Sequence, residues 1–260
     1  MDQNDHMQRS ERLRVIIRAV DAGPRTIDEL VTLSGVSAIT VRRDLADLAE
    51  QGMLVRTRGG AAPAVRRGSE YPFQLRQAAD GEAKAELARL AAGLVRPGDS
   101  VLIDNGTTAL AVAAELAGLG ITAMALSLHA AAALASRPGN QVIVPGGTVG
   151  HDDLAFTSAS VITAIRDMRF DMVFFGACAA DPAAGLTVAT WDDAQIKRAA
   201  LHSARRAVLV ATADKFARTA AHRFGDFTDL DTIITTPDVD VTVTYDARQQ
   251  GVEVLTPKAD

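Results

Sequence analysis

The sequence has little cysteine and few aromatic side chains, and it lacks long apolar runs. Cys178 is the single cysteine among 260 residues, which excludes an internal disulfide and a zinc site built from several cysteines. The apolar stretches are too short to cross a bilayer; residues 130–135, for example, are closely flanked by His129 and Arg137. Residues 1–14 are polar and charged, unlike a secretory signal. We therefore expect a soluble cytoplasmic protein with no membrane partner.

Lysine is absent from the first 68 residues, where 11 arginines face 9 acidic residues and leave a net charge of +2. The remaining residues carry −7, which gives the whole chain its charge of −5. An acidic chain does not by itself suggest a nucleic-acid partner, but residues 37–67 hold six arginines against three acids. A mildly basic head on an acidic body is typical of a protein that binds specific DNA sites without coating itself in nonspecific DNA.

Residues 26–61 have the pattern of a winged helix-turn-helix. Thr26 and Glu29 form a capping box that starts one short helix, and a turn containing Gly35 ends it. Ser37 is placed to cap the helix that follows. In this geometry the second helix enters a major groove, so the pattern predicts that the chain binds DNA.

The second helix, expected from residue 38, should carry its arginines on the outer face. Val41, Leu45 and Leu48 recur at helical spacing and would face the core, which turns the neighbouring arginines outward. A short β-ribbon after residue 52 is basic and glycine-tipped, which suits contact with phosphates or a minor groove. The residues expected to contact DNA are Ser37, Thr40, Arg42, Arg43, Arg56, Arg58, Gly59 and Gly60.

Beyond residue 80, short apolar runs alternate with helical segments, which predicts an α/β domain with a doubly wound parallel sheet. The expected strands are 101–103, 121–126, 142–144, 172–175, 207–211 and 232–234, with 252–255 as a candidate edge strand. The expected helices are 8–22, 82–95, 108–119, 128–136, 159–167 and 193–204. We expect a DNA-binding domain over 1–62, a linker over 63–80, and the α/β domain over 81–260.

A ligand site is expected at the carboxyl ends of the parallel strands. Asp104 and the run Gly106-Thr107-Thr108 follow the first strand and open a helix, which offers the backbone N–H groups of a phosphate cradle. Gly146-Gly147 follows the third strand and Lys215 the fifth, where each could meet an anionic ligand. Asp193 either joins this site or is a simple helix N-terminal charge. The histidines show no metal-ligand spacing, and we expect neither a metal nor another cofactor.

These residues resemble bacterial transcription regulators of the DeoR type, also called the glycerol-3-phosphate regulator type, over about residues 9–256. In the DNA-binding domain, the resemblance rests on the motif from Val36 through Leu45 and on Arg58–Ala61. In the α/β domain, it rests on the strand-end motifs described above. The resemblance implies a carboxyl domain similar in fold to ribose-5-phosphate isomerase that senses a sugar phosphate and thereby changes operator affinity, usually weakening repression. The ligand-binding residues expected are Asp104, Gly106, Thr107, Thr108, Gly146, Gly147, Asp193, Lys197 and Lys215.

The chain departs from the family pattern where sugar hydroxyls would be read. Ala125-Leu126 replaces a common Thr-Asn pair, Thr212 stands where an Asp is common, and Asp193 is one methylene shorter than the usual Glu. Ser158 replaces a usual Gly, and Arg58 a usual His. The phosphate loop is intact, so the sequence predicts either an unusual phosphorylated ligand or a weakened sensor.

A single head of charge +2 would bind DNA weakly, so we expect a homo-oligomer, either a dimer or a tetramer, on double-stranded operator DNA. The chain is expected to be a repressor of carbohydrate genes and not an enzyme, although the sequence does not distinguish repression from activation. One alternative is an isomerase-like enzyme with Asp104 as base and Lys215 as electrophile. The other is a DNA-binding oligomer that responds to no ligand.

Overall fold

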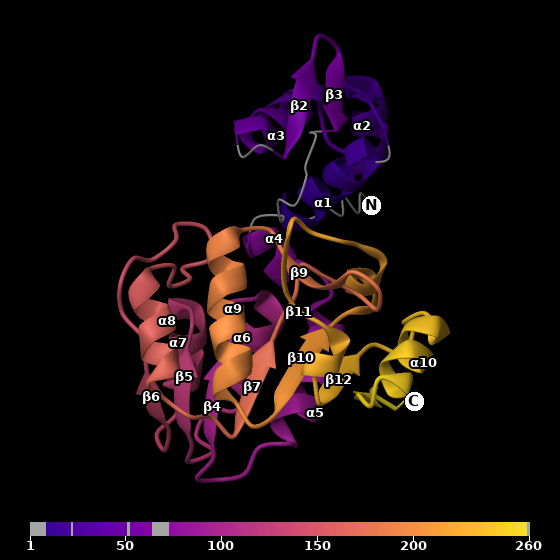
Figure 1. Ribbon diagram of the computed structural model, residues 1–260. Coiled ribbons are helices and arrows are strands. Elements are labelled where there is room, and N and C mark those ends of the chain that lie inside the picture. The colour runs from indigo at the N-terminus through magenta and orange to yellow at the C-terminus, as the bar shows by residue number, and fades with distance from the viewer. Residues whose placement is uncertain (1–8, 22, 51–52, 64–72, 259–260) are drawn as a thin grey trace. The chain divides into compact units, whose positions relative to one another are not determined.

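The computed structural model describes residues 9–21, 23–50, 53–63 and 73–258, and the chain divides into two compact units (Figure 1). One unit is formed mainly by residues up to 66, and the other holds Phe73 and the residues from 80 onward. A six-residue helix, α4 (Phe73–Ala78), lies inside the segment 63–80 that the sequence assigns to a linker. The expected linker therefore contains regular structure at its carboxyl end.

The first unit is a winged helix-turn-helix, as the sequence predicts. Its strands form one antiparallel sheet in the order β1-β3-β2, so the expected two-stranded ribbon gains a short third strand. Residues 8 and 22, the expected ends of the first helix, lie outside the described residues. The elements are α1 (Arg9–Asp21), β1 (Arg25–Thr26), α2 (Ile27–Ser34), α3 (Ala38–Glu50), β2 (Leu54–Thr57) and β3 (Gly60–Pro63).

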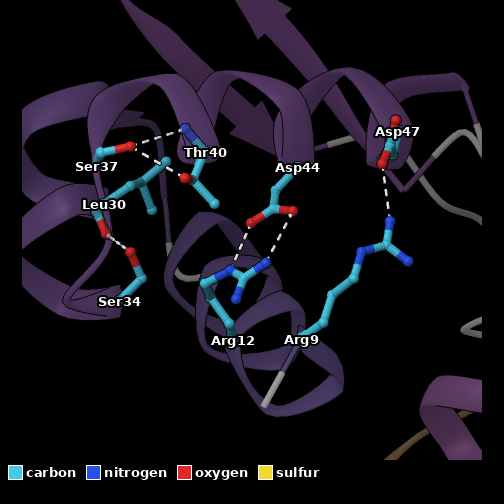
Figure 2. Close-up of polar contacts among 8 residues, drawn as sticks. All are labelled: Arg9, Arg12, Leu30, Ser34, Ser37, Thr40, Asp44 and Asp47. Carbon is cyan, nitrogen blue, oxygen red and sulfur yellow. Dashed lines mark hydrogen bonds and ion pairs between the residues drawn. The ribbon is translucent and has the colours of Figure 1, made fainter. Parts of the chain in front are cut away.

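The two central helices begin where their capping residues predict. Thr26 Oγ1 accepts the N–H of Glu29 at 3.2 Å, and Glu29 Oε2 accepts the N–H of Thr26 at 2.7 Å, which confirms the capping box. Gly35, with φ +68°, ends α2 in the left-handed conformation that glycine adopts without strain. Ser37 Oγ accepts the N–H of Thr40 at 3.3 Å and caps α3 (Figure 2).

The second unit is built on a seven-stranded parallel sheet in the order β13-β12-β10-β7-β4-β5-β6. This order confirms the doubly wound α/β prediction. The strands are β4 (Ser100–Ile103), β5 (Thr122–Ala125), β6 (Gln141–Ile143), β7 (Met172–Phe175), β10 (Ala207–Ala211), β12 (Thr232–Thr235) and β13 (Glu253–Leu255). The α-helices are α5 (Gly81–Ala92), α6 (Thr107–Glu115), α7 (Leu128–Leu134), α8 (Ala159–Arg166), α9 (Trp191–Ser203) and α10 (Val241–Gln249).

Helices cover both faces of this sheet, because side chains alternate along each strand. Val101 and Ile103 pack in a core with residues of α5, α6 and α7, whereas Leu102 between them packs with residues of α8 and α9. In Figure 1, α9 lies in front of the sheet. Strands buried on both faces read as continuous apolar runs, which is why they could be found from the sequence.

A second, antiparallel sheet of three strands was not expected. It joins β8 (Ala179–Asp181), β9 (Gly185–Val188) and β11 (His222–Gly225) in the order β11-β9-β8. Two of its strands come directly after β7, and β8 packs against the 3-10 turn η1 (Ala213–Ala217) that follows β10. The small sheet therefore belongs to the carboxyl edge of the large one, where a ligand is expected.

Candidate DNA-binding and effector sites

Asp44 and Asp47 of α3 are paired with arginines of α1 (Figure 2). Asp44 is buried and takes two bonds from Arg12, from Nε to Oδ2 at 2.7 Å and from Nη2 to Oδ1 at 3.4 Å. Arg9 Nη2 lies 2.8 Å from Asp47 Oδ2. These pairs neutralise charges on α3 that would otherwise repel phosphate, and they join α1 to α3.

The opposite side of α3 is open to solvent. Arg42 and Arg43 are exposed, as predicted, while Val41 is fully buried. Ile39 is 78% exposed, and the helical spacing places it on the same face as the two arginines. The sequence-based prediction does not single out this isoleucine, although an apolar residue outside the buried stripe of a helix is a signal that could have found it. An exposed isoleucine there offers an apolar surface suited to a thymine methyl group.

The wing exposes its arginines but buries one of its glycines. Arg56, Arg58 and Gly59 are exposed, whereas Gly60 is buried. A Cβ atom on Gly60 would lie 1.8 Å from the carbonyl oxygen of Arg25, so glycine is required there by the close approach of β1. This packing accounts for the Gly60 residue, and its contact with DNA stays a prediction.

In the α/β unit, the direction of strand order reverses between β4 and β7, which makes this the point where ligands of open sheets bind. Asp104 follows β4 and Gly176 follows β7. The Gly176 N–H donates to Asp104 Oδ2 at 2.7 Å, which closes the two strand ends onto each other. The expected site residue Asp104 therefore lies at the switch point, 1% exposed.

Lys197, from the second turn of α9, is buried against this carboxylate. Its Nζ donates to Asp104 Oδ2 and, at 3.2 Å, to the Gly176 carbonyl. Asp193 Oδ1 lies 3.8 Å from the same Nζ and accepts from Asn105 Nδ2 at 3.4 Å. Burial lowers the pKa of Lys197, but the charges of Asp104 and Asp193 raise it by more, so the pKa lies above its ordinary value. Lys197 is therefore an ammonium.

One carboxylate oxygen of Asp104 accepts no hydrogen bond from the described residues. This oxygen, Oδ1, is buried. A buried carboxylate oxygen without a donor is costly, because it has lost its water without replacement. An oxygen placed in this way can accept a hydrogen bond from a ligand hydroxyl.

The helix α6 begins three residues after Asp104, and its N-terminus has no side-chain cap. Gly106 is the extended N-cap residue and, having no side chain, provides no capping oxygen. Thr107 and Thr108 follow and are 9% and 8% exposed. The first N–H groups of a helix have no intrahelical acceptor, and the helix dipole favours an anion beside them. This end of α6 can therefore receive a phosphate.

The remaining predicted ligand residues lie at other strands of the same edge. Gly146 and Gly147 follow β6, two positions from β4 in the sheet, with φ values of +75° and +94°. Lys215 lies in η1 after β10, two positions away in the other direction, with its Nζ 3.7 Å from Asp214 Oδ2. The contacts thus join Asp104, Asp193 and Lys197 directly, while the glycine pair and Lys215 stand further along the edge.

Three residues near the switch point have no assigned role in the sequence-based prediction. Asn105 and Gly176 lie at strand ends that the sequence indicates, and in the structure both bond to site carboxylates. Trp191 begins α9 and is 54% exposed. The Arg198 guanidinium lies 5.4 Å from the centre of its ring, and the His222 ring meets it edge-on at 6.0 Å.

Within the described residues, no group of three or more His, Cys, Asp or Glu side chains could hold a metal ion. The same part of the chain has no helix that is long and apolar enough to cross a membrane.

Two family models match this chain. The DeoR-like helix-turn-helix domain matches residues 19–65, and the DeoR C terminal sensor domain matches residues 79–236. The chain belongs to the DeoR family. The two matches fall on the two compact units, so the DeoR assignment includes both the DNA-binding head and the sensor domain, and the resemblance read from the sequence is confirmed.

Relatives of known name are similar along nearly their whole length. A glycerol-3-phosphate regulon repressor of Haemophilus influenzae is 33% identical over 257 residues, covering 96% of this chain and 98% of that one. The HTH-type transcriptional repressor GlcR of Bacillus subtilis is 28% identical over 255 residues, covering 98% of each. Among solved structures, ribose 5-phosphate isomerase A of Methanocaldococcus jannaschii matches 53% of this chain and 55% of its own, at 18% identity and a TM-score of 0.38. A likeness at that level carries no weight for activity.

Proposed function

We propose that this DeoR-family regulator is a repressor of carbohydrate genes whose operator affinity changes when a phosphorylated sugar binds at the switch point of its sensor domain. One observation carries the effector part of the proposal. The buried Asp104 keeps Oδ1 without a donor, three residues before the first residue of α6, whose N-terminus has no side-chain cap. A molecule that bears both a hydroxyl and a phosphate meets both requirements at once.

The residues of the sensor take different roles in this proposal. The effector phosphate accepts from the backbone at Gly106, Thr107 and Thr108, while a sugar hydroxyl donates to Asp104. Lys197 positions the Asp104 carboxylate rather than contacting the phosphate, because its ammonium already bonds to Asp104 and Gly176. Asp193 lies beside Lys197 at the same point. The expected ligand contacts further along the edge would complete the site around the sugar: Gly146, Gly147 and Lys215.

On the DNA side, α3 reads bases and the wing holds the backbone. Arg42, Arg43 and Thr40 contact bases or phosphates, and Ile39 packs on a thymine methyl. The other expected contacts are made mainly with phosphates: Ser37 through the start of α3, and Arg56, Arg58, Gly59 and Gly60 from the wing. Two heads of a homo-oligomer would bind two half-sites, which compensates for the small charge of each head.

The regulator is favoured over the isomerase-like alternative by the arrangement of its charged groups. Asp104 and Lys215, the pair that isomerisation would need, follow strands two positions apart, and Asp104 is paired with Lys197 instead. Incubation of the concentrated protein with ribose 5-phosphate tests the alternative, and formation of a ketose product above background would support it.

The test begins with an operator selected from randomised DNA by the purified full chain. Glycerol 3-phosphate, glucose 6-phosphate, ribose 5-phosphate and their unphosphorylated parents are then screened by thermal shift and by operator binding. At saturation a true effector should stabilise the protein by about 2–4 kcal/mol and change the operator Kd. Binding of an unphosphorylated sugar alone would contradict the phosphate assignment. If no compound changes the thermal stability or the operator Kd, the result would favour an oligomer that responds to no ligand.

A further inference from the structure

The side chain of Phe73 is built into the sensor domain, although it lies in the segment expected to be a linker. Its ring is 1% exposed and stacks on the His129 ring, with 4.5 Å between ring centres and 7° between ring planes. Its backbone N–H donates to Asp152 Oδ2 at 2.9 Å. We call this stack and hydrogen bond the Phe73 anchor. It fixes the chain that comes from the DNA-binding head to two segments far away in the sequence.

The two segments that receive the anchor are bonded to each other. His129 is the second residue of α7, which follows β5, and Asp152 lies in the loop between β6 and α8. The N–H of Leu128, next to His129, donates to the Leu154 carbonyl at 3.0 Å. The N–H of Phe156 donates to the Leu126 carbonyl at 2.9 Å. A shift of the β6–α8 loop therefore moves both halves of the anchor together.

The same loop begins with the glycine pair expected to meet the effector. Gly147 has φ +94°, which favours glycine, and a Cβ atom there would lie 1.8 Å from Ser158 Oγ at the start of α8, so a side chain would force Ser158 to move. Leu154, near the other end of the loop, has φ +53°, a conformation that leucine rarely adopts. Such a loop holds its shape through a few close contacts and one strained residue. Strained residues are typical of segments that exchange between two arrangements.

We propose that the Phe73 anchor couples the effector site to the DNA-binding head. This inference rests on the proposed effector site, because the β6–α8 loop carries Gly146 and Gly147 at one end and Asp152 near the other. An anchored linker leaves the heads fewer arrangements, so two heads lose less freedom when they bind two half-sites. The anchored form is therefore the operator-binding form. An effector that binds better when the loop has moved and the anchor is released lowers operator affinity, as linkage requires.

The test uses the full chain with either half of the anchor removed. Phe73→Leu removes the ring that stacks on His129 and keeps an apolar side chain, and Asp152→Ala removes the acceptor of the Phe73 N–H. The matched controls are Phe227→Leu, which alters another phenylalanine that is 1% exposed, and Asp167→Ala, which removes an exposed aspartate at the end of α8. For each variant we would measure the Kd for the selected operator without ligand, and again with the sugar phosphate that shifts the wild-type Kd.

We expect both anchor variants to bind the ligand-free operator about five-fold more weakly or worse, and to lose most of the response to the sugar phosphate. Their own affinity for the sugar phosphate, measured by calorimetry, should be at least that of the wild type. Both controls should keep the wild-type response. The proposal is wrong if the anchor variants keep the wild-type operator Kd and response, or if the controls lose the response to the same degree.

Failure of the effector proposal would be visible separately. If no compound of the panel shifts the wild-type Kd, the sugar-phosphate assignment fails, and the anchor is judged by the ligand-free operator Kd alone. A loss confined to Phe73→Leu and Asp152→Ala then still supports coupling through the anchor, whereas unchanged binding by both variants overturns it.

Discussion

The head and the sensor each bury one carboxylate beside a basic side chain, but they use it differently. In the head, both carboxylate oxygens of Asp44 accept hydrogen bonds from the Arg12 guanidinium, so neither oxygen needs a partner from outside the protein. In the sensor, Asp104 gives Oδ2 to Lys197 and to the Gly176 N–H, and its Oδ1 has no donor among the described residues. A completed pair holds two helices together, whereas an incomplete pair in a binding crevice keeps an acceptor for a ligand.

Breaking the sensor pair should have the largest effect on stability. Lys197→Met leaves the Asp104 charge buried without its partner, because both side chains are at most 3% exposed. We expect the free energy of unfolding of the sensor to fall by about 3–5 kcal/mol, measured by urea denaturation of the full chain. Adding Asp104→Asn should restore part of that loss. A loss no larger than that of an exposed-site variant would show that the pair is not desolvated.

Breaking the head pair should cost less, because Arg12 is 12% exposed and can reach water when its partner is removed. For Asp44→Ala we expect a loss of about 1.5–3 kcal/mol in the unfolding of the head. The double variant Asp44→Ala with Arg12→Met should have a free energy of unfolding close to that of Asp44→Ala alone. Circular dichroism during urea unfolding measures the change. Equal losses of stability for the Asp44 and Lys197 variants would contradict the expected difference between the two pairs.

The exposed arginines of the head should affect binding without affecting stability. If Arg58 contacts one phosphate, Arg58→Ala lowers the slope of log K against log salt by about one unit and weakens all DNA sequences alike. The free energy of unfolding should change by no more than about 0.5 kcal/mol. Arg58→Lys is the matched control and should keep the slope. A loss confined to one operator sequence would instead assign Arg58 to base recognition.

The smallest effect concerns the capping box at the start of α2. The backbone N–H of Thr26, and then its hydroxyl, donate to Glu29 and lower the pKa of that carboxyl below its ordinary value. A lowered folded-state pKa adds stability above the unfolded-state pKa, and this stability is lost as pH falls through the folded-state value. Unfolding of the wild type and of Glu29→Gln should therefore differ at neutral pH and converge in acid, below about pH 4. A constant difference across that range would contradict the pKa assignment.

The sequence predicted what depends on local periodicity. Capping by Thr26 and Ser37 was readable because each cap involves residues only three positions apart. The parallel strands were readable because both of their faces are buried. The expected burial of Val41, Leu45 and Leu48 is confirmed for the same kind of reason, since one helix repeat decides it.

What depends on distant contacts could not be predicted in the same way. Asp104 and Lys197 were both expected at the site, but only the sheet order shows that they pair with each other across 93 residues. Strands β8, β9 and β11 have three or four residues each and carry little pattern of their own. Phe73 lies next to a stretch rich in Ala, Arg and Pro with little periodicity, so the sequence did not show that it is buried.

Trp191 has a practical consequence for studying this regulator. It is the only tryptophan of the chain, so tryptophan fluorescence reports on the start of α9, an element of the sensor domain. The Arg198 guanidinium and the His222 ring against the indole make its emission sensitive to any rearrangement there. A fluorescence change on adding a metabolite would record events in the sensor without a label. A change on adding operator DNA, which the head binds, would be an optical signature of communication between the two domains.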